Sequence, residues 1–189
     1  SLLFSVGAYA ATIVRNVVPS TNGLIFHAKY DETSATSIDS ISGGTSTTPG
    51  GSPVFGSVGV VKRGLYDQSA SVYVDFVDNP ALSSLTGSAP YSVSWWYKTD
   101  NTATADTIWT KHRYVSGTNR GGYTGGASNV GKPQFSVSNN SNTITLTSSI
   151  SVVTSTWAHV VGTYDGTSTV SIYVNGVLGG QQAYTGQTG

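Results

Sequence analysis

The carboxylates are the first side chains to test for chemistry, and their number limits what they can do. The chain has 189 residues with nine Asp and Glu, and Glu32 is the single Glu. Retaining glycoside hydrolysis needs two carboxyl groups about 5 Å apart, and inversion needs a wider pair. Asp75 and Asp78 are close in sequence, but we interpret them as residues of a strand end and a turn. The sequence therefore predicts no glycosidase pair.

The nucleophilic chemistries are also poorly supported. The chain has three His and no Cys, and it contains no Gly-x-Ser-x-Gly segment. Serine hydrolases need a Ser and a His held together, and thiolate and zinc–thiolate chemistry needs Cys. His27 and His159 fall inside predicted strands, where a structural role is expected, and His112 lies in a solvent-facing basic run. We predict a protein that is not an enzyme.

Aromatic side chains are the best candidates for ligand binding. Trp109 and Tyr114 precede a Gly-rich segment, residues 117–131, that contains Tyr123 and that we predict to be a loop. Sugars present apolar C–H faces that stack on exposed aromatic rings. These three residues are therefore candidates for a carbohydrate site, and the alternative is that Trp109 is a core residue and both Tyr are ordinary surface residues. The remaining tryptophans, Trp95, Trp96 and Trp157, are assigned to core or sheet packing.

The elements that position these residues are short strands. Apolar runs alternate with clusters of Gly, Ser, Thr, Asn and Pro, which is typical of β-sandwiches. Asn175-Gly176 predicts a type I′ hairpin, because both residues tolerate positive φ. Residues 31–53 are predicted to be a polar loop. Expected strands are 24–30, 54–61, 64–67 paired with 70–76, 91–98, 107–111, 134–137, 143–147, 157–164 and 170–174.

Composition excludes several classes of partner. The chain contains 28 Ser and 25 Thr, its charged fraction is 10%, and its formal net charge is zero. Nucleic acids and anionic membranes require dense basic patches, so we expect neither as a partner. No apolar run reaches the roughly 18 residues of a membrane span. This Ser/Thr-rich, charge-poor composition suits a protein of the cell surface, the extracellular space or a virion.

The first 19 residues are apolar and prone to form a strand. Their β-branched and large apolar side chains could pair with the exposed sheet edge of a neighbouring subunit. The alternative is a strand that completes the chain's own sandwich. We divide the chain into an N-terminal arm, residues 1–21, and one domain, residues 22–189. The residues assigned to the arm contact are Leu3, Phe4, Val6, Ile13 and Val14.

Three groups of segments, in order, carry a family resemblance. They are GLIFHAKYDET (23–33); GLYD (64–67), YVDF (73–76) and YSVSWWYK (91–98); and WAHVVGTYDG (157–166) with VSIYVNG (170–176). Together they resemble the laminin G-like domain of the concanavalin A-like lectin/glucanase superfamily. The resemblance implies an antiparallel two-sheet jelly-roll sandwich. The chain departs from the family pattern after the Asn175-Gly176 hairpin, where the family continues into closing strands. We therefore predict a domain that lacks one or more of these strands.

The resemblance also raises calcium as a cofactor, since some related domains bind it. Calcium takes six to eight oxygen ligands. Asp31, Asp67, Asp75 and Asp165 lie near predicted strand ends and could each supply one or two of them. The chain has no compact Asp-x-Asp-x-Asp loop, and a role in turns is the simpler interpretation of each residue. No other cofactor is predicted.

Two functions follow from these observations. The leading hypothesis is a structural or adhesive module that assembles with itself or with neighbouring subunits by strand exchange through the arm. The alternative is a lectin-like module that binds neutral glycans through its loop aromatics. The fold is compatible with both, because it hosts lectins, glycanases, adhesion modules and structural proteins.

Overall fold

The computed structural model describes residues 23–28, 30, 45–50, 54–60, 63–66, 73–76, 82, 89–103, 105–115, 118–138 and 142–184. The chain divides into two compact units, Ser1–Asn79 and Pro80–Gly189. The arm residues Leu3, Phe4, Val6, Ile13 and Val14 lie outside the described residues, so strand exchange stays a prediction. In the described part of the chain, no helix is long and apolar enough to span a membrane.

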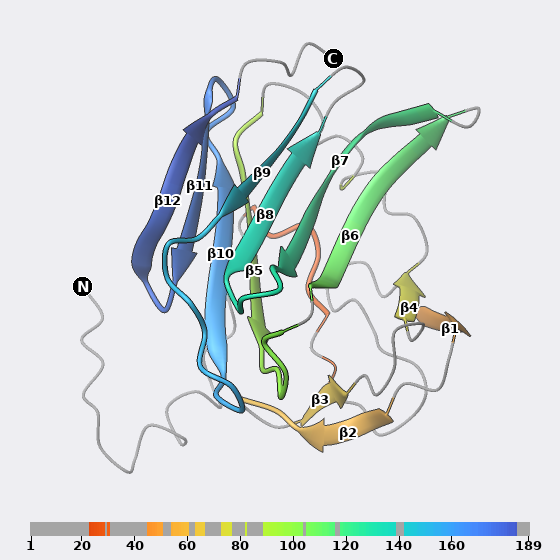
Figure 1. Ribbon diagram of the computed structural model, residues 1–189. Helices are drawn as coiled ribbons and strands as arrows, with labels where there is room; N and C mark the ends of the chain where they lie inside the picture. The colour runs from red at the N-terminus through yellow and green to blue at the C-terminus, as the bar shows by residue number, and fades with distance from the viewer. Residues whose placement is uncertain are drawn as a thin grey trace. The chain divides into compact units, whose positions relative to one another are not determined.

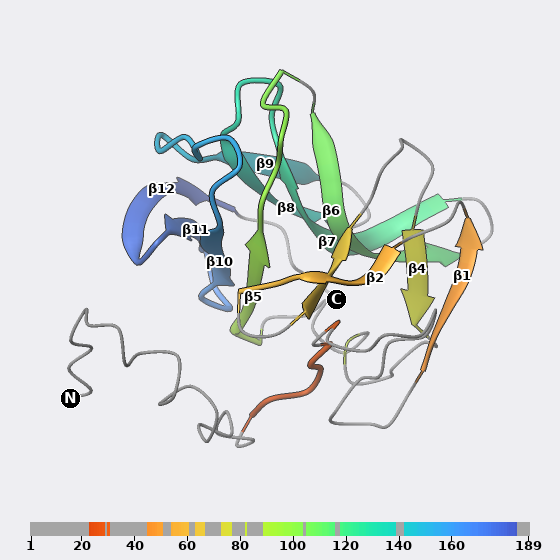
Figure 2. The ribbon, with the colours of Figure 1, turned by 90° about the horizontal axis from the view of Figure 1, so that it is seen from below.

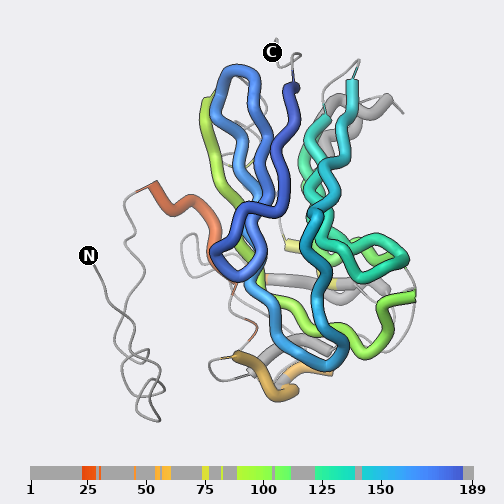
Figure 3. Tube along the Cα trace, turned by 60° about the vertical axis from the view of Figure 1, so that its left-hand side comes forward, coloured from red at the N-terminus to blue at the C-terminus, as the bar shows by residue number. Residues whose placement is uncertain are grey.

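The second unit is an antiparallel β-sandwich of two four-stranded sheets (Figures 1 and 3). The first sheet has the order β12-β11-β10-β5, and the second has the order β6-β7-β8-β9. This confirms the predicted all-β, two-sheet class. The strands are β5 (Tyr91–Tyr97), β6 (Asp106–Val115), β7 (Thr118–Ala127), β8 (Pro133–Ser138), β9 (Thr143–Thr147), β10 (Ala158–Tyr164), β11 (Thr169–Val174) and β12 (Val177–Ala183).

The core of this unit lies between the two sheets and is unusually aromatic. Successive side chains of a strand point to opposite faces, so every second residue of β5, β8 and β10 enters the core. Phe135, Val160 and Ile172 are fully buried, and Tyr91 packs against Tyr123 with ring centroids 5.2 Å apart. Burying a side chain of this size contributes about 1.5–3 kcal/mol. Burial also raises the pKa of Tyr97 to about 12, so its hydroxyl stays protonated.

The predicted Asn-Gly hairpin is confirmed. Asn175 and Gly176 have φ angles of 51° and 80°, the left-handed values that a type I′ turn requires. The Asn175 backbone N–H donates to the His159 carbonyl at 2.8 Å, and the Asn175 side-chain Oδ1 accepts from the His159 N–H at 2.9 Å. The turn between β11 and β12 is thereby tied to the start of β10.

The Gly-rich segment 117–131 is not the predicted loop. Thr118–Ala127 forms strand β7, which pairs with β6 on one side and β8 on the other. Its glycines make room for neighbours, because a Cβ on Gly125 would overlap the Trp109 indole and a Cβ on Gly126 would overlap the Asp106 carbonyl. Glycine inside a strand often marks such a close approach. The sequence interpretation failed because it treated these glycines as breaks in the strand.

The described residues of the first unit form two short antiparallel pairs (Figure 2). In one pair β1 (Ser46–Gly50) lies beside β4 (Tyr73–Phe76), and in the other β2 (Val54–Val58) lies beside β3 (Arg63–Tyr66). The predicted pairing of 64–67 with 70–76 is therefore wrong, and β1 lies inside the predicted loop 31–53. The β1–β4 pair joins segments distant in sequence, which local patterns do not encode, whereas β2 and β3 are consecutive along the chain.

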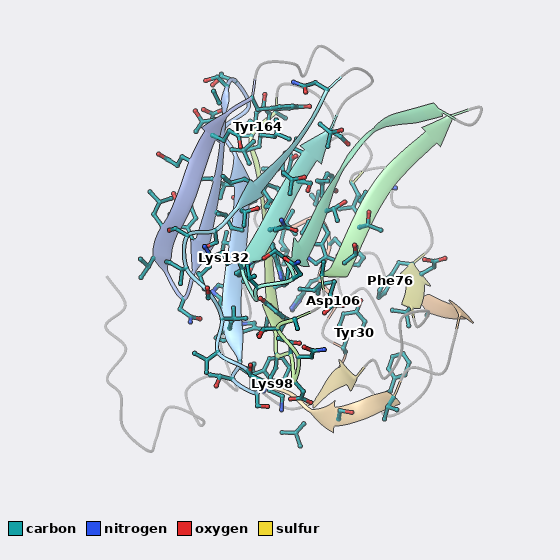
Figure 4. The ribbon with its side chains drawn as sticks, in the orientation of Figure 1. Tyr30, Phe76, Lys98, Asp106, Lys132 and Tyr164 are labelled. Atoms are coloured by element: carbon teal, nitrogen blue, oxygen red, sulfur yellow. The ribbon has the colours of Figure 1, made fainter. Side chains whose placement is uncertain are left out.

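The predicted strand 24–30 is not a regular strand in its described residues, where Ala28 makes an isolated bridge. Aromatic contacts hold this segment. The Phe26 ring meets the Phe76 ring edge-to-face at 5.0 Å, and the Tyr30 ring meets it at 6.2 Å, as Figure 4 shows for Tyr30 and Phe76. Phe76 of β4 thus contacts both described aromatic rings of this segment.

Candidate functional site

Two of the three aromatic residues predicted to bind sugar face the core of the sandwich. The Tyr123 side chain is 4% exposed. Trp109 is partly buried, and its ring lies 5.2 Å from Trp95 and 6.3 Å from Phe135. A sugar cannot stack on the Tyr123 ring while the two sheets stay packed. Tyr114 lies on β6, and its side chain is outside the described part of the chain.

Of the four candidate calcium ligands, the structure describes Asp75 and Asp165, which lie in different units, so calcium binding by these residues stays a prediction. Asp75 is exposed on β4, and Asp31 and Asp67 lie outside the described residues. Asp165 caps a turn: its Oδ1 accepts the backbone N–H groups of Thr167, Ser168 and Thr169 at 2.8–3.0 Å. These donors hold the pKa of Asp165 well below its usual value. Among the described residues, no group of three or more His, Cys, Asp or Glu is placed to hold a metal ion.

The outer face of the first sheet carries an aromatic that the sequence analysis assigned to packing. Trp95 and Trp96 are neighbours on β5, so their side chains point to opposite faces. Trp95 is 8% exposed in the core, whereas Trp96 is 49% exposed. Trp96 therefore presents an indole ring to solvent from a regular, hydrogen-bonded strand.

Three side chains lie around Trp96, and together with it they form what we call the Trp96 block: Trp96, Lys98, Trp157 and His159. Trp96 lies directly opposite His159 in the register of β5 and β10, and the two rings stack with centroids 4.8 Å apart and an interplanar angle of 29°. Beside them, the Lys98 Nζ lies 5.9 Å from the centre of the Trp157 ring. Each basic side chain thus contacts the tryptophan of the neighbouring segment.

A hydrogen bond to Ser94 orients the His159 ring, and a second one holds the His159 backbone. Its Nε2 lies 2.7 Å from the Ser94 Oγ, and its backbone N–H donates to Asn175. Burial lowers the pKa of His159 below its ordinary 6.5, so the ring is neutral at pH 7. Ser94 and His159 resemble two members of a catalytic triad. No Asp or Glu occurs on the four strands of this sheet, however, and a triad needs an acid to orient the His.

The rest of this face is uncharged and mixes hydroxyl and amide groups with the apolar side chains of Val161 and Leu178. In the row next to Trp96, Ser94 lies opposite Val161, which lies opposite Tyr173. In the row beyond, Ser92 lies opposite Thr163 and Thr163 opposite Ser171, whose Oγ accepts from the Gln181 Nε2 at 3.0 Å. The face thus combines an exposed aromatic ring with hydroxyl and amide groups.

The sequence contained a signal for this site. Two consecutive tryptophans in a strand with period-two alternation cannot both enter one core, so one of them must lie on the outer face. What the sequence did not contain was the partner strand. Only the pairing of β5 with β10 brings His159 against Trp96.

A family match covers residues 68–189 and is described as the concanavalin A-like lectin/glucanases superfamily. The chain belongs to this superfamily. The resemblance inferred from the sequence is thereby confirmed. The match includes both four-stranded sheets and all of the Trp96 block. No curated protein sequence matches the chain.

Solved neurotoxin structures share the sandwich at low sequence identity. One is a structure of botulinum neurotoxin type C, whose cell entry depends on interaction with two ganglioside molecules. Its TM-score is 0.63 and its sequence identity 15%, with 86% of this chain and 39% of that chain covered. The binding domain of botulinum neurotoxin serotype C1 has a TM-score of 0.66 and a sequence identity of 14%, with 87% of this chain and 39% of that chain covered. A heptameric SAP-like pentraxin from Limulus polyphemus has a TM-score of 0.39 and a sequence identity of 18%, with 50% of this chain and 44% of that chain covered.

The chain therefore spans about two-fifths of the length of the neurotoxin structures. At these sequence identities the likeness shows a shared fold.

Proposed function

We propose that this chain is a carbohydrate-binding module of lectin type, and that it holds a saccharide on the outer face of the first sheet. The observation that carries the proposal is the half-exposed ring of Trp96, held in place by the stack on His159. An aromatic platform of fixed orientation suits the C–H face of a pyranose, because little side-chain freedom is lost on binding.

The polar surroundings of Trp96 complete the chemistry. A sugar needs donors and acceptors around its edge as well as a ring beneath it. Ser92, Ser94 and Thr163 supply hydroxyl groups on the same face, and Gln181 lies at its far side. Each group either donates or accepts, which matches the hydroxyl groups of a saccharide.

Known proteins of this fold support a binding role. The superfamily takes its name from lectins and glucanases. A neurotoxin of similar fold interacts with ganglioside molecules. The single Glu of the chain favours binding over hydrolysis, since glycosidases need a carboxylate pair. We therefore propose a non-catalytic protein, located at a cell surface, in the extracellular space or in a virion. The strand-exchange assembly is kept as the competing proposal.

The test is calorimetric titration of the protein with a panel of oligosaccharides. Trp96→Ala is expected to weaken binding by about 2 kcal/mol, about thirtyfold, which is typical of an aromatic anchor. Trp96→Phe is expected to restore part of the affinity, because it keeps a ring at the same place.

A matched control is Val130→Ala, which removes an exposed apolar side chain from the turn between β7 and β8. It is expected to leave the affinity unchanged. If no saccharide binds the unmodified protein, the lectin proposal is wrong. If saccharides bind equally well to Trp96→Ala, the protein binds them elsewhere.

A further inference from the structure

We propose that the Trp96 block selects acidic saccharides, with Lys98 binding the carboxylate of a uronate-type sugar whose ring stacks on Trp96. This inference rests on the proposed lectin function and names its ligand class. It differs from the neutral glycans expected from the composition of the whole chain.

The first observation is the position of Lys98. It directly follows β5, two residues after Trp96, so both side chains lie on the outer face about 6.5 Å apart along the strand. Figure 4 shows Lys98 at the end of this strand. A carboxylate on a pyranose that covers Trp96 is therefore within reach of the flexible Lys98 side chain.

The second observation is that Lys98 is oriented without being neutralised. Its Nζ lies 5.9 Å from the centre of the Trp157 ring. A cation over an indole face is attracted to it and loses some of its conformational freedom, but it keeps its full charge. Within the described residues, no carboxylate pairs with Lys98. Its ammonium group is thus available to an anionic ligand.

The third observation is the charge of the whole face. Strands β5, β10, β11 and β12 contain no Asp or Glu. Asp100 is the first acid after Lys98, and its carboxylate already accepts a hydrogen bond from Ser155 at 2.8 Å. Lys98 and His159 are the basic groups that border Trp96. An acidic sugar on Trp96 therefore meets one cation and no carboxylate of the sheet itself.

The experiment compares neutral oligosaccharides with uronate oligosaccharides of the same linkage. Matched pairs are β-1,4-glucan with β-1,4-glucuronan, and β-1,4-mannan with β-1,4-mannuronan, titrated calorimetrically into the full chain as oligosaccharides. In low salt the charged member is expected to bind about two- to fivefold more tightly, as for an exposed ion pair. In about 1 M salt, where the screening length falls to about 3 Å, the preference is expected to disappear.

Lys98→Gln is the decisive variant. It is expected to abolish the preference, so that the charged and the neutral member of a pair bind about equally. The matched control is Lys132→Gln, since Lys132 directly precedes β8 of the second sheet, and it is expected to keep the preference. Urea denaturation of each variant verifies that the fold is intact.

The outcomes separate this inference from the proposed function. Equal binding of both members of every pair, or a preference for the neutral member, overturns the acidic-sugar inference and leaves the lectin function standing. A preference that persists in Lys98→Gln also overturns it. If neither member of any pair binds, both proposals fail together.

Discussion

At the scale of single residues, two pairs of chemically similar side chains have opposite roles. Trp95 is a core residue and Trp96 an exposed one, although they are adjacent in sequence. Tyr123, a candidate for sugar stacking, is buried, whereas His159, expected to be structural, borders the exposed ring. Residue type alone did not separate these roles, because strand alternation and partner strands decide them.

His159 is expected to make stability depend on pH. Burial lowers its pKa below 6.5, so the unfolded chain binds a proton more readily than the folded chain. The free energy of unfolding should then fall as the pH decreases below about 6.5, since stability increases with pH where the unfolded state binds more protons. Urea midpoints measured between about pH 7.5 and pH 5 test this.

The control for this prediction is His159→Gln, which keeps a polar group but cannot titrate in this range. The difference in midpoint between the unmodified protein and the variant should change with pH in the stated direction. If both proteins show the same pH dependence, other histidines are responsible and His159 contributes nothing.

At the scale of elements, β10 connects the core to the candidate site. Its inward residues include Val160 and Gly162, and its outward residues include His159. Gly162 lies against the Phe135 ring of β8, and a Cβ at this position would overlap that ring. The glycine lets the two sheets approach where the large side chain of Phe135 fills the core.

Gly162→Ala is expected to destabilise the protein by about 1–3 kcal/mol, the usual cost of overpacking a core. The matched variant is Gly180→Ala on β12, where the nearest atom to the new Cβ is a Leu146 methyl group at an ordinary 3.4 Å. Gly180→Ala should be close to neutral. Urea unfolding followed by tryptophan fluorescence measures both, and equal destabilisation by the two variants would contradict the explanation.

At the scale of the whole molecule, the described core of the sandwich lies within one unit. All members of its buried core cluster lie between Tyr91 and Tyr184. Both four-stranded sheets and the Trp96 block lie inside the second unit, Pro80–Gly189. A unit with its own hydrophobic core meets the physical requirement for independent folding.

We therefore expect residues 80–189, produced alone, to fold cooperatively and to keep saccharide binding. A single unfolding transition by both circular dichroism and fluorescence would show cooperative folding, as for most small domains. Non-cooperative unfolding of this fragment, beside a cooperative transition of the full chain, would show that the sandwich depends on residues 1–79.

Much of the sandwich could be predicted from local patterns. The strands around Tyr91–Tyr97 and Ala158–Tyr164 and the turn at Asn175-Gly176 followed from alternation and from the φ angles that Asn and Gly tolerate. Strand β7 was missed, because its glycines are there for close packing. The pairing of β1 with β4 was also missed, since such contacts join segments distant in sequence.

The sequence by itself determined the fold class and the family, because alternation, turn residues and the order of the family segments are properties of the chain as written. Only the tertiary structure decided which aromatics are available to a ligand. Burial depends on which strands lie against each other, so the interior position of Tyr123 and the exposed stack of Trp96 on His159 arise from sheet pairing and sandwich packing.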